Sequence, residues 1–221
     1  MKPQPLALFD LDFTLLDADS EALWCRYLLD LGMVSPEFMA GIEAFYRDYE
    51  NGTLDLPRYE QFLLAPLVSL PPVELTRLLE GYLPLITATA RPGMMERVDW
   101  HRAKKHTLVL VTAANSFLAE PIAEMLGFPI VICTQVEKRD GCLTGNISGV
   151  PAFQHGKVIR LTTWLLRERR LSLAGSWFYS DSHNDLPLLK LVDHPILVEP
   201  DNVLRQYGLE HSWEILESCY Q

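Results

Sequence analysis

The chain has 221 residues, of which 48% are hydrophobic and 22% charged, a balance typical of a globular protein that buries its own core. Its 19 basic and 29 acidic residues give a formal net charge of −10, which disfavours nucleic acid and anionic membranes as partners. The same charge repels phosphorylated ligands at long range. Any anion site must therefore be local, built from a cation, a lysine or backbone N–H groups.

Cysteine usage and hydropathy indicate a cytoplasmic protein. The four cysteines are Cys25, Cys133, Cys142 and Cys219. No two of them form a C-x-x-C pair and none has a histidine at ligand spacing, so we expect reduced thiols rather than disulfides or a zinc site. We expect no secretory signal, because Met1–Pro5 runs directly into an apolar strand. The longest apolar stretch, Phe62–Leu70, is too short to span a bilayer.

Five short apolar runs are predicted to form buried strands: Leu6–Phe9, Thr107–Val111, Ile130–Cys133, Trp177–Tyr179 and Ile196–Val198. Between most of these strands, apolar residues recur at helical spacing. The pattern is clearest in Phe117–Leu126, which Gly127 ends, and in Lys157–Arg169. Strands that alternate with helices predict an α/β fold, with a Rossmann-like parallel sheet covered by helices on both faces.

The stretch from Leu16 to Thr87 has a different pattern. Its apolar residues recur at helical spacing, several prolines interrupt it, and it contains no strand pattern. We therefore predict an all-helical cap domain over residues 16–87, inserted into an α/β core made of residues 1–15 and 88–221. Within the core, Asp140-Gly141 is a hairpin signal inside Val136–Ile147, which we expect to form a small flap.

Two carboxylates follow the first predicted strand. Asp10 and Asp12 are two residues apart and so lie on the same side of an extended chain, where the apolar run stops. Like charges this close are unfavourable unless a cation or a shared proton compensates for them. Taken alone, the pair also fits two solvated loop carboxylates.

Polar groups follow other predicted strands as well. Thr112 and the N–H of Ala113 precede a helix, an arrangement that suits either an anion or a simple helix cap. Lys157 opens a helix, where its charge opposes the helix dipole, so it is either a solvated lysine or the partner of an anion. Asp181 and Asp185 can hold a hard cation or cap a helix. Most of these groups fall at the carboxyl ends of parallel strands, where open α/β sheets bind ligands.

In this order the motifs resemble those of the haloacid dehalogenase superfamily. The matching residues are Asp10, Asp12 and Thr14 for the D-x-D-x-T motif, Thr112 for the second-strand hydroxyl, Lys157 for the lone lysine, and Asp181 with Asp185 for the acidic loop. Ser180 replaces the glycine that usually opens that loop. The resemblance covers the whole chain, and the position of the helical segment is similar to that in the subfamily containing phosphoserine phosphatases.

The resemblance implies a Mg²⁺-dependent phosphatase with a covalent intermediate. Asp10 would attack phosphorus, and Asp12 would protonate the leaving alcohol and then deprotonate the attacking water. Asp10, the backbone carbonyl of Asp12 and Asp181 would hold Mg²⁺, with Asp185 assisting directly or through water.

The resemblance also implies how the phosphoryl group is held. Thr112, the N–H of Ala113 and Lys157 would bind the phosphoryl oxygens, and Asn184 in the acidic loop is a further candidate for substrate binding. Because Asp12 is present, dehalogenation is disfavoured, whereas a phosphoryl transferase would use the same residues. The oligomeric state is not predicted.

The substrate is predicted from the cap. The family's acidic residue that pairs with a substrate ammonium falls at Asp19, with Glu21 nearby, although both also fit helix N-terminal charge. The arginine that grips the carboxylate of phosphoserine falls within Tyr59–Pro66, which has no basic residue. We therefore expect a small phosphorylated metabolite without a carboxylate, histidinol phosphate first, with phosphoserine as the alternative. Cap aromatic residues fit either an imidazole pocket or the cap core: Trp24, Tyr27, Phe45, Tyr46 and Tyr49.

Overall fold

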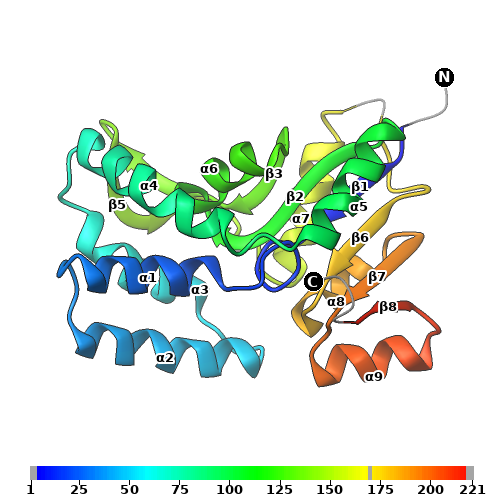
Figure 1. Cartoon of the computed structure of the whole chain (residues 1–221), viewed down its shortest axis with the longest axis horizontal. Helices are drawn as coiled ribbons and strands as arrows, with labels where there is room; N and C mark the ends of the chain where they lie inside the picture. The colour runs from blue at the N-terminus through cyan, green and yellow to red at the C-terminus, as the bar shows by residue number, and fades with distance from the viewer. Residues whose placement is uncertain (1–3, 169–170, 218–221) are drawn as a thin grey trace.

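The computed structural model describes residues 4–168 and 171–217. Met1–Pro3, the predicted helix end at Arg169, and Cys219 lie outside the described residues, whereas Cys25, Cys133 and Cys142 are free thiols. A six-stranded sheet, in the order β3-β2-β1-β6-β7-β8, forms the centre of the molecule (Figure 1). All its neighbouring strands run parallel, which confirms the predicted α/β class.

The strands lie close to where the apolar runs predict them. Their bounds are β1 Leu6–Phe9, β2 Thr107–Asn115, β3 Ile130–Thr134, β6 Trp177–Ser180, β7 His194–Val198 and β8 Glu214–Leu216. Strand β2 continues four residues beyond its predicted end, because Asn115 still pairs with Thr134 of β3 after an irregularity. The short edge strand β8 is an addition to the prediction.

Both faces of the sheet are buried, as expected for a parallel sheet between two layers of helices. Along β1, Ala7 and Phe9 enter one apolar core, whereas Leu6 and Leu8 enter a second core on the opposite face. The first face is covered by α5 (Pro92–Ala103) and α6 (Ser116–Leu126), and the second by α7 (His155–Leu165), α8 (Leu186–Leu189) and α9 (Asn202–Glu210). Helix α6 ends as predicted at Gly127, whose φ of 77° is left-handed.

The segment between β1 and α5 is helical, in agreement with its spacing. It contains α1 (Ser20–Asp30), α2 (Pro36–Glu50), α3 (Leu56–Leu64), the 3₁₀ helix η1 (Ala65–Leu67) and α4 (Pro72–Thr87). Figure 1 shows α1, α2 and α3 to one side of the sheet. Two chain segments connect these helices to the rest of the chain, one before α1 and one after α4, and they run side by side. Asp17 N donates to Thr89 O at 2.7 Å, and Arg91 N donates to Leu15 O at 2.9 Å.

The predicted hairpin is confirmed as β4 (Val136–Arg139) paired antiparallel with β5 (Cys142–Ile147). Its turn residues Asp140 and Gly141 have φ values of 53° and 82°, as a tight hairpin turn requires. The hairpin contacts the helical segment, where Gln61 Nε2 donates to Asn146 Oδ1 at 3.0 Å.

Among residues 4–168 and 171–217, no single helix has the length and apolarity to cross a bilayer. The helical segments Leu56–Leu67 and Pro72–Thr87 are long and apolar enough only when taken together, and a bend of 102° separates them.

Candidate active site

Asp10 lies directly after the central strand β1. Its backbone is fixed there, because Asp10 N donates to Tyr179 O of β6 at 3.0 Å. The chain then folds back tightly, since Leu11 O accepts the N–H groups of Thr14 and Leu15 at 3.3 and 2.9 Å. This turn keeps Asp10 and the following acid at the carboxyl edge of the sheet.

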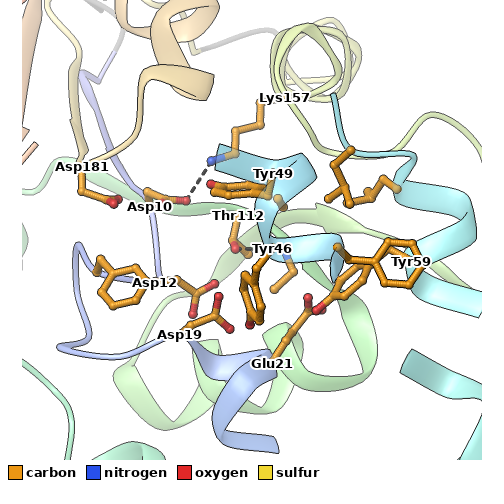
Figure 2. Close-up of a pocket in the computed structure, with 16 residues that line it drawn as sticks. Asp10, Asp12, Asp19, Glu21, Tyr46, Tyr49, Tyr59, Thr112, Lys157 and Asp181 are labelled. Carbon is orange, nitrogen blue, oxygen red and sulfur yellow. Dashed lines mark hydrogen bonds and ion pairs between the residues drawn. The ribbon is translucent and has the colours of Figure 1, made fainter. Parts of the chain in front are cut away.

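Lys157 connects two of the predicted acids. Its Nζ lies 2.8 Å from Oδ1 of Asp10 (Figure 2). The same Nζ lies 2.7 and 2.8 Å from the two carboxylate oxygens of Asp185. All three side chains are buried. Burial raises the pKa of Asp10 to about 6, although the positive charge of Lys157 acts to lower it. Burial lowers the pKa of Lys157, but the charges of Asp10 and Asp185 outweigh it and raise that pKa above its usual value.

The position of Lys157 depends on a close backbone contact. A Cβ atom at Gly156 would lie 1.8 Å from the carbonyl oxygen of Pro151, so only glycine fits there. Gln154, two residues earlier, has φ 50° and ψ −121°, a conformation that glycine adopts more easily than glutamine. The first turn of α7 is therefore fixed by its backbone.

Thr112 and Ala113 lie in β2 beside Asp10. The Thr112 hydroxyl accepts the N–H of Ala114 at 3.1 Å, which leaves its own hydrogen available to a ligand. Thr134 of β3 donates to the carbonyl of Ala113 at 2.7 Å and fixes that peptide. Both Thr112 and Ala113 line the same pocket as Asp10.

The acidic loop after β6 brings both of its carboxylates to this edge. Asp181 Oδ1 accepts the Thr14 hydroxyl at 3.0 Å, which links the loop to the turn after β1. Burial, followed by the charge of Asp10, raises the pKa of Asp181 well above its usual value. Asp185 faces Lys157 and the Ser180 hydroxyl, which is 2.7 Å from its Oδ2.

Asn184 in this loop binds protein groups. Its Nδ2 donates to the backbone carbonyl of Tyr49 at 3.2 Å, and its Oδ1 accepts Nε2 of Gln154 at 2.9 Å. Gln154 Nε2 also lies 3.1 Å from the carbonyl of Gly52. These contacts join α2 and the turn after it to the loops that carry Lys157 and Asp181. The predicted contact of Asn184 with substrate stays a prediction.

Asp12 lies partly buried on the helical side of Asp10. Its Oδ1 accepts the N–H of Ser20 at 2.6 Å, at the start of α1. Burial, with the charges of Asp19 and Asp10, holds the pKa of Asp12 well above its usual value. Asp19 is both the N-cap of α1, accepting Ala22 N at 2.7 Å, and part of the pocket wall, so the two interpretations of this residue are compatible.

Glu21 lies deeper in the pocket. Its Oε1 accepts two hydrogen bonds from Asn115, from the backbone N–H at 3.1 Å and from Nδ2 at 2.8 Å. Burial, together with the charge of Asp19, raises the pKa of Glu21 to about 7. Sequence reasoning overlooked its neighbours Asn115 and Glu60, since an asparagine before a helix reads as a cap and a glutamate in a helix reads as surface.

A pocket of about 650 Å³, counting its open mouth, joins these groups. Figure 2 shows Lys157 and Asp10 at one end, with Asp12, Asp19 and then Glu21 following toward Tyr59. The predicted aromatic residues divide into two groups. Phe45, Tyr46 and Tyr49 line the pocket, whereas Trp24 packs in the core against Tyr82 and Phe117, with Tyr27 beside it.

The donor set fits a hard divalent cation. The buried carboxylates of Asp10 and Asp185 share the ammonium of Lys157, and the partly buried Asp181 adds a third carboxylate at the same edge of the sheet, so negative charge exceeds positive charge there. Carboxylate and carbonyl oxygens are the ligands that Mg²⁺ prefers, together with water. Within the described part of the chain, no three His, Cys, Asp or Glu side chains converge as a ready-made metal site. The fit therefore relies on Asp10, Asp181 and a backbone oxygen.

Comparison with known proteins assigns the family. The model of haloacid dehalogenase-like hydrolases matches residues 7–190. The chain belongs to this family. A histidinol-phosphatase from Neisseria meningitidis is 38% identical over 96% of this chain and 97% of its own length. The protein is thus a haloacid dehalogenase-type phosphatase acting on a phosphorylated compound, as the motifs predicted, and phosphatases of this family typically use Mg²⁺.

Other proteins are similar to this chain at lower coverage or lower identity. Phosphoserine phosphatase SerB1 from Mycobacterium tuberculosis is 35% identical over 56% of this chain and 40% of its own. A Bordetella pertussis protein of unknown function has a TM-score of 0.88 and 37% identity, covering 97% of this chain and 99% of its own. A substrate-bound phosphoserine phosphatase, with a TM-score of 0.69 and 18% identity over 93% of this chain and 91% of its own, shares the fold.

Proposed function

We propose that this phosphatase hydrolyses histidinol phosphate through an aspartyl-phosphate on Asp10, with Mg²⁺ as cofactor. The observation that carries the substrate assignment is the charge distribution in the pocket. Among the described residues that line it, Lys157 is the only cation, whereas Asp19 and Glu21 lie at the other end among tyrosines. A substrate that is anionic at its phosphate and basic at its other end complements this pocket. The name of the Neisseria relative supports the same substrate.

The first step is attack on phosphorus by Asp10. Lys157 binds Oδ1 of this carboxylate at 2.8 Å, which leaves the other oxygen to form the bond to phosphorus. Thr112 and the N–H of Ala113 hold phosphoryl oxygens, and Lys157 offsets their charge. Because phosphoryl transfer depends mainly on positioning and charge neutralisation, these contacts are the main catalytic contribution of the core.

Asp12 serves as the acid and the base. Its raised pKa keeps a proton available, which it gives to the leaving alkoxide as the ester bond to phosphorus breaks. The resulting carboxylate then takes a proton from the water that attacks the aspartyl-phosphate. This second step releases inorganic phosphate, restores the carboxylate of Asp10 and returns Asp12 to its protonated form.

Mg²⁺, when bound by Asp10, the carbonyl of Asp12 and Asp181, supplies positive charge to the phosphoryl group. Asp181 is oriented for this by the Thr14 hydroxyl at 3.0 Å. Asp185 keeps Lys157 in place beside Asp10 through contacts of 2.7 and 2.8 Å.

Residues 16–87 act as the cap domain of this enzyme in the proposal, on a core of residues 1–15 and 88–221. Supporting this division, α2 and α3 contribute Tyr46, Tyr49 and Tyr59 to the pocket wall, opposite the residues of the sheet. The cap thus selects the alcohol while the core performs the phosphoryl transfer. A cytoplasmic location suits the free thiols of Cys25, Cys133 and Cys142.

A panel of phosphate esters with Mg²⁺ tests the proposal. We expect kcat/KM for histidinol phosphate to exceed that for phosphoserine by roughly 100-fold or more, because a buried acidic pocket leaves the carboxylate of phosphoserine without a partner. Phosphoethanolamine, with an amine but no ring, should fall between them. Phosphoserine as the preferred substrate would overturn the assignment.

A further inference from the structure

Glu60 is a buried acid that the reaction above does not use. It lies on α3 with 0% of its surface exposed, and its Oε2 accepts Nδ2 of Asn115 at 3.1 Å. Its other oxygen, Oε1, has no hydrogen-bond partner among the described residues. Burying an incompletely bonded carboxyl group is unfavourable, so an apolar residue would suit the fold better at this position.

Asn115 places Glu60 directly behind Glu21. The same Nδ2 that donates to Glu60 also donates to Oε1 of Glu21 at 2.8 Å, and the Asn115 backbone N–H donates to that oxygen at 3.1 Å. The Asn115 Oδ1 accepts the N–H of Leu118 at 3.3 Å and caps α6. Asn115 is therefore fixed by a helix of the core while it holds one carboxyl group from α1 and one from α3.

Burial raises the pKa of both carboxyl groups. Burial, followed by the charge of Glu21, raises the pKa of Glu60 well above its usual value. The pKa of Glu21 reaches only about 7, because Asn115 and the Tyr59 hydroxyl partly offset the effects of burial and of Asp19. Because the charge of Glu21 raises the pKa of Glu60, ionisation of Glu21 favours the protonated form of Glu60.

Glu21 lacks a counter-charge in the part of the chain that the structure describes. The titratable groups near it are Asp19 from the turn before α1, Cys25 on α1, Tyr46 on α2, Tyr59 and Glu60 on α3, and Tyr82 on α4. None of these groups is basic, and the ammonium of Lys157 is held by Asp10 and Asp185 at the other end of the pocket. Figure 2 shows Asp19 beside Asp12 and Glu21 further away, so the pocket offers two acidic positions at different depths.

We propose that Glu60 and Asn115 position Glu21 to bind a second basic nitrogen of the substrate, such as that of an imidazole ring. Asp19, nearer the phosphate, then binds an amine close to the ester. This inference rests on the proposed function and extends it to the class of phosphate esters with two basic nitrogens. Glu60 acts through Asn115 as a positioning residue and supplies no proton to the reaction.

The experiment compares histidinol phosphate with p-nitrophenyl phosphate, which has no basic nitrogen, in Glu21→Gln, Glu60→Leu and Glu60→Gln. We expect Glu21→Gln and Glu60→Leu to raise KM for histidinol phosphate roughly tenfold or more, so that selectivity over p-nitrophenyl phosphate falls equally. Glu60→Gln, a neutral isostere of the protonated acid, should stay within about threefold of wild type. The matched control is Glu43→Gln, an exposed carboxylate on α2. Thermal melts establish that each variant is folded.

Inhibition by free histidinol separates this inference from the substrate assignment. With p-nitrophenyl phosphate as reporter, the inhibition constant of histidinol should rise roughly tenfold in Glu21→Gln and Glu60→Leu and stay unchanged in Glu43→Gln. Wild-type enzyme that is inhibited in this Glu21-dependent way, yet does not hydrolyse histidinol phosphate, would refute the substrate and support the subsite. Equal losses on both esters in Glu60→Leu, or unaltered histidinol inhibition in Glu21→Gln, would overturn the subsite.

Discussion

The hydroxyl of Ser180 donates to Oδ2 of Asp185 at 2.7 Å, and the N–H of Ser182 donates to the same hydroxyl at 3.2 Å. Ser180 occupies the position that is usually glycine in the family motif, so this chain orients its second loop carboxylate with a side chain. Asp185 in turn holds Lys157, and Lys157 holds Asp10. A hydroxyl at the end of β6 is thereby linked to Asp10, the proposed nucleophile, through two intermediate charges.

Ser180→Ala should lower kcat by roughly 10-fold, because a hydrogen bond to a buried carboxylate contributes about 1.5–3 kcal/mol and Asp185 keeps only its contact with Lys157. Steady-state kinetics with p-nitrophenyl phosphate, at saturating Mg²⁺, measures this loss. The exposed Ser69→Ala serves as the control and should match wild type. Wild-type kcat in Ser180→Ala would show that Lys157 alone orients Asp185.

Asp10→Asn should reduce kcat by on the order of 10⁴ or more while leaving the fold intact, since the amide cannot form the bond to phosphorus. Circular dichroism and thermal melts verify the fold. In wild-type enzyme, acid quench during turnover followed by mass spectrometry should show one phosphoryl group on the peptide that contains Asp10. A folded Asp10→Asn enzyme that keeps its activity would refute the covalent mechanism.

Chelation should abolish turnover, and added Mg²⁺ should restore it. Because a ligand that binds only the folded state raises stability by mass action, Mg²⁺ should also raise the melting temperature of the wild-type protein. Asp181→Asn removes one proposed ligand, so its melting temperature should respond less to Mg²⁺ at the same concentration. Full activity in excess EDTA, with no melting shift from Mg²⁺, would contradict the proposed metal.

Much of this site follows from the sequence because strand ends are local signals. The apolar run Leu6–Phe9 stops at Asp10 and the run Trp177–Tyr179 stops just before Ser180-Asp181, and neighbouring parallel strands bring those stops together. The small strand Glu214–Leu216 was not predicted, since three residues with a charge at the start carry no alternation to recognise. Its existence depends on pairing with β7.

The far end of the pocket is harder to predict from sequence. Glu60 lies in a helix where a glutamate normally faces water, and its burial arises only from the way α3 packs on Asn115 of the sheet. The sequence around Asn115 predicts a helix cap, and the residue does cap α6. No local pattern predicts that its side-chain amide also donates hydrogen bonds to two glutamates. Contacts between segments distant in sequence, rather than propensity, decide both positions.

His101 provides a test of pH-dependent stability away from the site. It is buried on α5, with Nε2 2.9 Å from the Tyr179 hydroxyl and Nδ1 2.7 Å from Nδ1 of His106. Burial, followed by the charge of His106, lowers the pKa of His101 to about 3. The unfolded chain therefore binds a proton below pH 6.5 that the folded chain does not, so His101 makes folding less favourable as pH falls from 6.5 toward 3.

Urea unfolding of wild type and His101→Phe at several pH values isolates this effect. The free energy of unfolding of wild type, minus that of the variant, should decrease by up to about 1.4 kcal/mol per pH unit below pH ~6, and stay flat above pH ~7. The buried acids with raised pKa values stabilise the folded state as pH falls. Their contribution is the same in wild type and variant, so subtracting the two free energies of unfolding removes it. A difference that does not change with pH would mean that His101 is charged in the folded protein.

Gln154 combines a backbone conformation that favours glycine with two hydrogen bonds, to the carbonyl of Gly52 and to Asn184 Oδ1. Gln154→Ala and Gln154→Gly both remove those bonds, so both should lower kcat/KM for histidinol phosphate, by roughly 3- to 10-fold. Only the glycine variant relieves the strained φ, so it should be about 1–2 kcal/mol more stable than the alanine variant. Equal stability in the two would show that the conformation carries no strain.

Two bonds from the loops of the sheet end on main-chain oxygens of the helical segment, those of Tyr49 on α2 and Gly52 just after it, whereas the donating side chains, Asn184 and Gln154, belong to the other part of the chain. A carbonyl is present whatever residue bears it. The helices that shape the alcohol side of the pocket are therefore free to diverge in sequence without losing these attachments. Substitutions on the helical half can therefore change the pocket wall while the other half keeps these two bonds.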